Sequence, residues 1–423
     1  MSAHLSSPSK SGRPSSIEAQ AAVPIPSAER AMQRVLIYSH DTYGLGHLRR
    51  SMRIASAMTE SGVARHVLIA SGSPQAGSFA MPPGVDVVKM PAVTKDDGGG
   101  YRSRTLGIGL DDLAEVRARL VLAAVESFQP DAVLIDHSPV GMHRELLPLL
   151  ESLGSLRHRP ALVLGMREII DAADLVELEW QRSGAWHHLE NTYDAVLVYG
   201  DGVVTTTAAE LGLAGRLPIP VHHVGYVAPA PVDVAKTHRR MPSIVVTTGG
   251  GGDGVPVLEA YLDFLESSVL ANRVRSVIVT GPFAEGGPVA SMVDRIIGLA
   301  KPVEIVRFSS WLDTVLATCD GAVTMAGYNT VAELLAHRVP AVLVPRRTPR
   351  VEQWLRATRL ASVASFTPVA TDELTVDHLG ALVEGVLDSQ LARDHQLDLG
   401  GARATGFALH RIVNTPGLTK EIA

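Results

Sequence analysis

The 423-residue sequence contains a single cysteine, Cys319, which excludes an intrachain disulfide and a cysteine-based zinc cluster. Aromatic residues make up only 4% of the chain and apolar residues 46%, a balance that favours parallel sheets covered by helices over an aromatic-rich β-sandwich. No apolar run approaches the roughly 20 residues that span a bilayer. The net charge of −6 gives no basic field for phosphates, so no nucleic acid partner is expected.

Residues 1–33 are rich in Ser, Pro and Ala but lack the apolar segment of a secretory signal. We predict a disordered leader there, with a solubilising tail as the alternative. Together with the lone cysteine, this favours a cytoplasmic location.

From residue 34 onwards, short aliphatic runs alternate with helical patterns such as those at residues 48–59 and 110–128. This alternation is typical of βαβ units and doubly wound parallel sheets. A chain of 423 residues also exceeds one ordinary core, which indicates two domains. The expected strands are residues 34–40, 66–70, 85–88, 132–135, 161–164 and 195–198, followed by 243–248, 276–280, 303–306, 321–324 and 341–344.

The pattern pauses at residues 228–240, which contain two prolines and no apolar periodicity. We therefore predict an α/β protein with two Rossmann-like domains, at residues 34–227 and 241–400, whose parallel sheets face an interdomain cleft. Residues 228–240 would be the linker. The last segment, 401–423, would contain a helix that packs back on the first domain.

The first glycine-containing loop, Asp41-Thr-Tyr-Gly-Leu-Gly-His47, lies between an expected strand and an expected helix. Gly44 and Gly46 let the backbone approach a ligand, and a helix N-terminus favours an anion. The loop is therefore a candidate floor under a sugar or phosphate. A tight turn with His47 at the helix end is the structural alternative.

The second loop, Thr247-Thr-Gly-Gly-Gly-Gly-Asp-Gly254, has five glycines in eight positions. Each costs roughly 0.5–1 kcal/mol of conformational entropy relative to alanine, which indicates close backbone contact with a ligand through Gly249, Gly250 and Gly251. The loop is not a Walker A motif, because no Lys-Ser or Lys-Thr follows. A flexible turn is the alternative.

The segment Met325-Ala-Gly-Tyr-Asn-Thr-Val-Ala-Glu-Leu-Leu335 follows another expected strand. We expect Gly327 to end the strand and Asn329 or Thr330 to open and cap a helix, whose free N–H groups would take a diphosphate. Two interpretations of Glu333 are open. It either completes a capping box with Thr330 or accepts hydrogen bonds from ribose hydroxyls.

The fourth segment, residues 345–353, lies at the carboxyl end of the strand expected at 341–344. Ligands bind at such strand ends in open α/β folds. Glu352 and Gln353 could bond sugar hydroxyls there. The neighbouring arginines 346, 347 and 350 could offset phosphate charge or form a solvated basic turn.

These four segments, in this order, resemble the GT-B glycosyltransferases, and most closely the MurG-like N-acetylglucosaminyltransferase group. That family has a glycine-rich loop ending in His after its first strand, as at residues 43–47. Its donor motif has Gly, then Thr three on, then Glu three further, matching Gly327, Thr330 and Glu333. The later triplet is at residues 351–353, with Val and Glu where Asp and Asn are usual. The second loop has Gly-Gly-Asp in place of a Ser-Gln pair.

The resemblance implies inverting, metal-independent transfer of a hexose or N-acetylhexosamine from a nucleotide diphosphate sugar, typically UDP-linked, to an acceptor hydroxyl. No cofactor beyond this substrate and no metal site are implied. Residues 327–330 would hold the diphosphate, Glu333 the ribose, the backbone at Phe308 the base, and Glu352 with Gln353 the sugar. The first domain would take the acceptor and the second the donor.

The acceptor, a glycan, a lipid carrier or a small molecule, would enter beside His47. This histidine is our first choice as general base, because its unperturbed pKa is near neutral. Asp136 and Glu168 are other candidates, and each could instead be a structural carboxylate.

A nucleotide-sugar epimerase or hydrolase, and a non-catalytic nucleotide-sugar-binding protein, stay open as alternatives. A weak peripheral contact with the inner face of the membrane is a further expectation. It would use residues 79–83 and 106–110 and the basic residues Lys95, Arg102 and Arg104, which could equally be loops over the core.

Overall fold

The computed structural model describes residues 31–41, 45–95, 100–232, 241–248, 254–280, 287–306, 312–388 and 395–415. Residues from Ala31 onwards form one compact unit. The first strand begins at Met32, so regular structure starts before residue 34, where the sequence placed its beginning. Most of the predicted leader, residues 1–30, lies outside the described residues.

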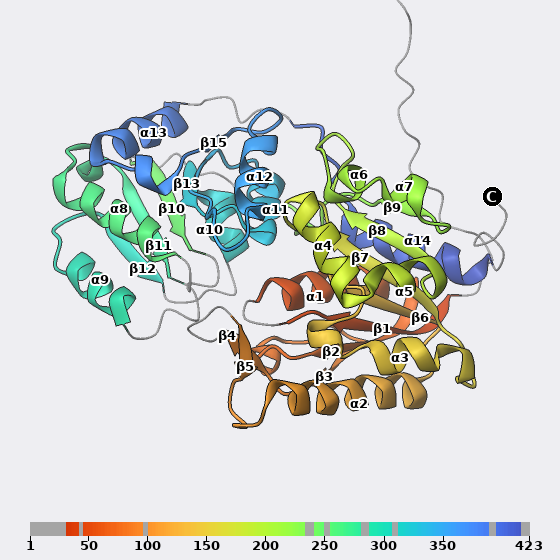
Figure 1. The fold of residues 1–423 in the computed structure, drawn as a ribbon. Helices are drawn as coiled ribbons and strands as arrows, with labels where there is room; N and C mark the ends of the chain where they lie inside the picture. Colours follow the sequence, from red (N-terminus) through yellow and green to blue (C-terminus); the bar gives the residue numbers. More distant parts are fainter. Residues whose placement is uncertain are drawn as a thin grey trace, which may run out of the picture. The chain divides into compact units, whose positions relative to one another are not determined.

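The first sheet has seven parallel strands in the order β3-β2-β1-β6-β7-β8-β9 (Figure 1). The order reverses beside β1, which pairs with both β2 and β6. The strands are β1 (Met32–Ser39), β2 (Ala64–Ser71), β3 (Val85–Lys89), β6 (Ala132–Asp136), β7 (Ala161–Arg167), β8 (Ala195–Tyr199) and β9 (Val221–His223).

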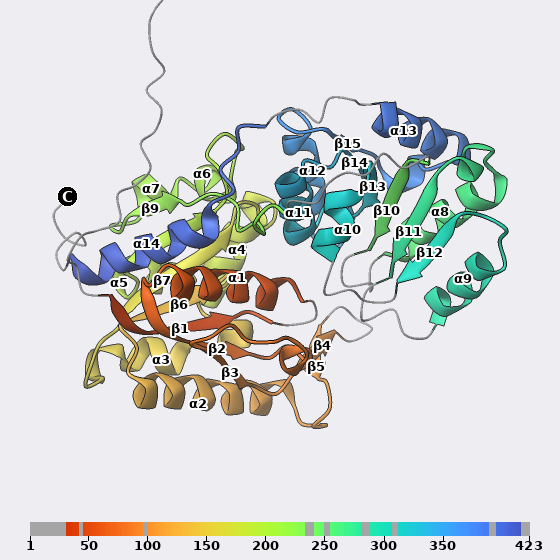
Figure 2. The same cartoon turned by 180° about the vertical axis from the view of Figure 1, so that it is seen from behind.

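Side chains of β1 alternate between the two faces of this sheet. Val35 and Ile37 belong to the same core as α1 (Gly46–Glu60) and α14 (Gly401–Asn414). Leu36 and Tyr38 share a second core with helices of the opposite face, and Figures 1 and 2 show the two layers. That face carries α2 (Leu110–Phe128), α3 (Leu147–Ser152), α4 (Ala173–Ser183), α5 (Ala185–Asn191), α6 (Thr207–Glu210) and α7 (Leu213–Arg216).

The second sheet has six parallel strands in the order β12-β11-β10-β13-β14-β15. They are β10 (Ser243–Thr247), β11 (Arg275–Val279), β12 (Val303–Val306), β13 (Gly321–Thr324), β14 (Ala341–Leu343) and β15 (Phe366–Pro368). One face packs on α8 (Val255–Ser267), α9 (Gly287–Ile297) and α13 (Val376–Asp388). The other packs on α10 (Leu312–Thr318), α11 (Tyr328–His337) and α12 (Glu352–Leu360) (Figure 2).

Smaller elements complete the described part of the chain. An antiparallel hairpin joins β4 (Val93–Lys95) and β5 (Tyr101–Ser103). Short 3-10 helices are found at Ala76–Ser78, Met142–Arg144, Leu153–Ser155, Leu270–Asn272 and Thr371–Glu373. None of the described helices combines the length and the apolar character that crossing a membrane requires.

The predicted α/β class with two parallel sheets is confirmed. Every expected strand is present, whereas the three-residue strands β9 and β15 and the β4–β5 hairpin were not predicted. The helix at the C-terminus lies against α1, where Gly406 adjoins Met58. The predicted domain boundaries and linker stay predictions, and residues 233–240 of that linker lie outside the described residues.

Candidate active site

The carboxyl ends of β1, β6 and β7 meet at one edge of the first sheet, because these strands are adjacent and parallel. His40 follows β1, Asp136 ends β6 and is followed by His137, and Arg167 ends β7. The N-terminal end of α1 brings His47 to the same place. Buried Asp41 holds that helix end, since its Oδ1 accepts from Leu48 N at 3.0 Å.

His47 and Asp136 form a hydrogen-bonded pair, with 2.6 Å between Nδ1 and Oδ2. The ionised carboxylate cannot donate, so Nδ1 of His47 must carry the proton. Nη2 of Arg50 also lies 2.9 Å from Nδ1, but both groups bind the same carboxylate, so we take that contact as incidental. The arrangement leaves Nε2 of His47 as the free basic nitrogen.

Asp136 is held ionised by Arg50, which is itself buried. The guanidinium donates from Nη2 to Oδ1 at 2.7 Å and from Nε to the same oxygen at 3.1 Å. Although burial acts to raise the pKa of Asp136, Arg50 and His47 hold it well below its usual range. The Arg50 guanidinium carbon also lies 5.5 Å from the ring centre of Tyr199 and 5.3 Å from that of Tyr328.

Burial lowers the pKa of His47 to about 4, even though Asp136 acts in the opposite direction. The imidazole is therefore neutral at physiological pH and ready to accept a proton, while Asp136 would stabilise the imidazolium that forms. The side chain of His47 is 17% exposed, so it stays within reach of a ligand. Two of the predicted catalytic residues thus form one acid–base pair.

Glu168, the third candidate base, lies in a different environment. Its carboxylate is fully buried and pairs with Arg356 of α12, with 2.5 Å between Oε1 and Nε. Arg356 also donates to the carbonyls of Ile169 and Ala326 at 2.9 and 3.1 Å. This ion pair fits the structural alternative for Glu168, and its role as a base stays a prediction.

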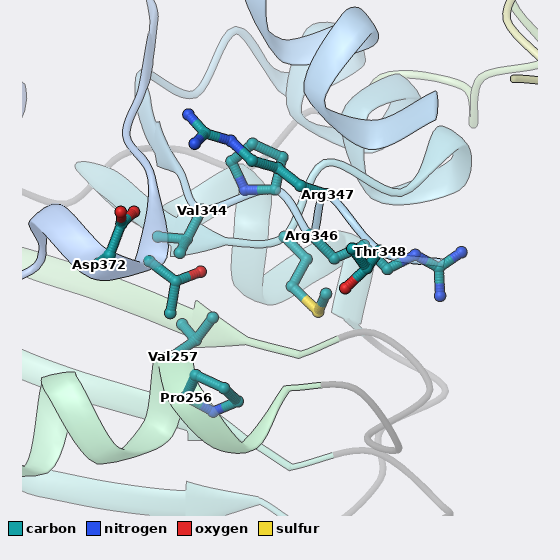
Figure 3. Close-up of a pocket in the computed structure, with 10 residues that line it drawn as sticks. Pro256, Val257, Val344, Arg346, Arg347, Thr348 and Asp372 are labelled. Carbon is teal, nitrogen blue, oxygen red and sulfur yellow. The ribbon is translucent and has the colours of Figure 1, made fainter. Parts of the chain in front are cut away.

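A cavity of about 430 Å³ lies at the carboxyl edge of the second sheet. Figure 3 shows Pro256 and Val257 of α8 on one side and residues after β14, among them Arg346, on another. Its other lining residues are Met325, Val344, Pro345, Arg347, Thr348, Thr371 and Asp372. The chain closes tightly beside it, because a Cβ on Gly254 would lie 2.1 Å from the Cβ of Thr248. Glycine is therefore required at position 254.

The amino end of α11 differs from the capping prediction. The helix begins at Tyr328 with Gly327 at the N-cap and has no side-chain cap, so neither Asn329 nor Thr330 caps it. Asn329 instead donates from Nδ2 to the carbonyl of Gly46 at 2.8 Å. A tertiary contact has replaced the local cap.

Glu333 is fully buried and does not form the capping box with Thr330 that its spacing suggested. Its Oε1 lies 2.8 Å from Nη2 of Arg49 and 2.8 Å from Nη2 of Arg53, both on α1. It is also absent from the lining of the 430 Å³ cavity. The carboxylate that would bind a ribose is therefore occupied by two arginines in this conformation.

Glu352 and Gln353 open α12 and are both buried. Glu352 Oε1 accepts from Nη2 of Arg346 at 2.7 Å, and Gln353 Oε1 lies 3.4 Å from the backbone N of the same arginine. Neither residue lines the cavity itself, but both contact Arg346, which does. Arg347 lines the cavity directly and stacks on Trp354, with its guanidinium carbon 3.8 Å from the ring centre.

Five predicted site residues lie outside the described residues: Gly44, Gly249, Gly250, Gly251 and Phe308. The described ranges contain no group of three or more His, Cys, Asp or Glu side chains arranged to hold a metal ion.

The sequence missed several residues that shape these sites. Arg50, Arg167 and the histidines 40 and 137 were not selected, nor was the Thr371–Glu373 turn that borders the cavity. The two arginines and two histidines could have been found from their positions, because each lies within three residues of a candidate residue or at the end of an expected strand.

This arrangement is the GT-B fold. The solved structure of Acinetobacter baumannii MurG has a TM-score of 0.54 and 13% identity, covering 90% of this chain and 98% of that one. A structure described as a putative UDP-N-acetylglucosamine 2-epimerase from Listeria monocytogenes has a TM-score of 0.60 and 12% identity, covering 90% and 96%. At such identities the likeness shows the fold alone.

Sequence comparison is more specific for the second half. Residues 267–398 match the model of the glycosyltransferase family 28 C-terminal domain. The UDP-N-acetylglucosamine–N-acetylmuramyl-(pentapeptide) pyrophosphoryl-undecaprenol N-acetylglucosamine transferase of Histophilus somni is 26% identical over 167 residues, 40% of this chain. The match spans only 46% of that relative's length. The resemblance to MurG-like GT-B glycosyltransferases is therefore confirmed.

Proposed function

We propose that the protein transfers a hexose or N-acetylhexosamine from a nucleoside diphosphate sugar, with uracil as the base, to a hydroxyl group of an acceptor. The observation that carries this proposal is the His47–Asp136 pair at the carboxyl edge of the first sheet. A neutral imidazole oriented by a buried carboxylate is suited to remove a proton from a hydroxyl group. The family 28 match of the second half supports a sugar nucleotide as the donor.

The reaction would be a single displacement with inversion. Nε2 of His47 takes the proton of the acceptor hydroxyl, whose oxygen attacks the anomeric carbon of the sugar. The bond from that carbon to the phosphate oxygen breaks, and its electron pair leaves with the nucleoside diphosphate. N–H groups at the amino end of α11 and the arginines at the cavity would stabilise this leaving group without a metal.

The donor would lie at the carboxyl edge of the second sheet, with its diphosphate near Gly327, Asn329 and Thr330. Arg346 and Arg347 bring two positive charges to the adjoining cavity. Glu333 would accept the ribose hydroxyls only after Arg49 and Arg53 move away. Glu352 and Gln353 would act on the sugar through the position of Arg346.

The direct test is incubation with UDP-sugars and a panel of acceptors, followed by mass spectrometry of the products. A new glycoside with the inverted anomeric configuration, formed in the presence of a chelator, is expected. A free sugar would instead identify a hydrolase, and an epimer would identify an epimerase. The structure described as a putative 2-epimerase has a similar fold, so the product analysis must test for both. Donor binding without any product would identify a non-catalytic binding protein.

Peripheral contact with the inner face of the membrane is a second proposal, and it implies a cytoplasmic protein. Leu106 is 56% exposed and Ile108 38% exposed, beside the exposed basic side chains of Arg102 and Arg104. Exposed apolar side chains close in sequence to exposed positive charges suit an anionic lipid surface. Flotation with anionic liposomes should be lost on combining Leu106→Ser with Ile108→Ser. Failure of the wild-type protein to float with these liposomes would refute the proposed membrane contact.

A further inference from the structure

Among the described residues, Arg167 has no ion-pair partner. It lies at the end of β7, where its side chain stays partly exposed, and burial together with Arg356 lowers its pKa to about 10. Within the part of the chain that the structure describes, its guanidinium makes no hydrogen bond or ion pair, and its Nε is buried without a partner. A half-buried cation with no protein partner is unfavourable, and because Arg167 is partly exposed an anionic ligand can reach it.

The neighbouring carboxylates form no ion pair with Arg167, because each is engaged by another cation. Glu168 pairs with Arg356, Glu352 pairs with Arg346, and Asp136 is bound by Arg50. The positive charge therefore stays available to a bound anion.

Two further histidines stand beside this arginine. The rings of His40 and His137 are 5.1 Å apart between centres, and both lie close to His47, at 5.5 and 5.2 Å. Among the described residues, Nδ1 of His40 and Nδ1 of His137 have no hydrogen-bond partner. Both side chains keep partial exposure, so they border solvent-accessible space. Hydrogen-bond donors thus converge with the arginine at the edge where open α/β sheets bind ligands.

We propose that Arg167, His40 and His137 form a subsite for an anionic group, phosphate or carboxylate, carried by the acceptor. This inference deepens the proposed function and rests on it, because the ligand is an acceptor only if the protein transfers a sugar. The subsite lies on the first sheet next to His47, whereas the arginine-lined cavity lies on the second. An anion held there would orient the acceptor so that its hydroxyl group meets Nε2 of His47.

The test uses the full chain and inorganic phosphate as the probe. Calorimetry should detect phosphate binding to the wild-type protein, and Arg167→Gln should weaken it at least tenfold. Arg65→Gln removes the same charge from an exposed residue near the start of β2, and it should leave the affinity unchanged. The ring signals of His40 and His137 in NMR spectra should shift with phosphate in the wild type only. Equal affinities in wild type and Arg167→Gln would overturn the subsite.

Thermal unfolding distinguishes a ligand-binding arginine from a structural one. In phosphate-free buffer, Arg167→Gln should unfold at the same or a higher temperature than wild type, because the substitution removes an unpaired charge. Phosphate should raise the unfolding temperature of the wild type alone. A marked loss of stability in Arg167→Gln would show that the arginine has a structural partner, and the proposal would be wrong.

Competition identifies the source of the anion. Phosphate bound at Arg167 should persist in the presence of UDP, because the donor occupies the second sheet. Displacement by UDP, with UDP affinity falling equally in Arg167→Gln, would assign the subsite to the donor diphosphate and overturn the acceptor assignment. Arg167-dependent phosphate binding without sugar transfer to any acceptor would refute the proposed function and leave the anion site standing.

Discussion

Asn329 donates a hydrogen bond of 2.8 Å to the carbonyl of Gly46, which precedes it by 283 residues. The contact joins the first turn of α11 to the first turn of α1, so the two loops singled out as acceptor and donor candidates touch each other. A Cβ on Gly46 would lie 3.0 Å from that same amide nitrogen. Glycine at position 46 therefore permits the contact.

A double-mutant cycle tests this relationship. Gly46→Ala should gain up to about 1 kcal/mol of helix propensity, but the crowded Asn329 amide should cancel the gain. In an Asn329→Ala background the same substitution should be stabilising. Urea unfolding of the four proteins measures the coupling. Equal effects of Gly46→Ala in both backgrounds would show that the two residues do not interact.

Removal of the candidate base should slow catalysis without affecting the donor. His47→Gln and Asp136→Asn should each lower kcat by about 10²–10⁴-fold while the donor Kd changes little. The imidazole must be neutral to accept a proton, so activity is lost as pH falls through the pKa of His47. With that pKa at about 4, the rate should be flat between pH 5.5 and 7. An acid limb near pH 6.5 would contradict this assignment.

Two partly buried histidines, His40 and His137, predict acid sensitivity of the fold. Burial lowers the pKa of His40 and of His137 well below the ordinary value, so protons bind the unfolded chain first as pH falls below about 6.5. The free energy of unfolding should therefore decrease from pH 7 to pH 5. Buried Asp41 acts in the opposite direction, since burial raises its pKa to about 6, but it is one group against several histidines.

Calorimetric scans between pH 7.5 and 4.5 measure this effect. The combination of His40→Gln with His137→Gln should flatten the decline of Tm, and His158→Gln, at an exposed position, should not. Parallel declines in wild type and both variants would refute the role of His40 and His137.

The arginines on Glu333 predict competition with the donor. If Glu333 binds the ribose, the combination of Arg49→Ala with Arg53→Ala should free its carboxylate and strengthen UDP binding several-fold, while lowering Tm because a buried charge loses its partners. Glu333→Gln should weaken UDP binding. The ribose role would be discarded if both proteins bound UDP like wild type in calorimetry.

Arg356 and Arg359 offer a matched comparison on one helix. Arg356→Met should cost about 3–5 kcal/mol, because it leaves Glu168 buried and unpaired. Arg359→Met breaks a partly exposed pair with Glu210 and should cost about 0–1 kcal/mol. Chemical denaturation measures both values. Similar decreases in the free energy of unfolding in the two variants would show that the buried Glu168 pair contributes no more than the partly exposed Glu210 pair.

Local periodicity predicted the sheets because buried parallel strands are continuous aliphatic runs, as at residues 132–135 and 244–246. His47 and Asp136 were each identified, but as rivals for one role. Their pairing depends on β1 lying beside β6, which no local pattern reveals. The spacing of Thr330 and Glu333 likewise favours a capping box, and two arginines from α1 took the carboxylate instead. The hydrogen-bond partners of these side chains come from segments distant in sequence, so short-range spacing could not predict them.

The ion pair between Glu168 and Arg356 joins positions 188 residues apart and is closed off from water. This ion pair therefore restricts which chimeras of related proteins will be stable. A chimera that takes residues up to the 228–240 segment from one parent and the rest from another must inherit a matched acid and base at both positions. Otherwise an enclosed charge would remain uncompensated, so the two positions should change together over evolution.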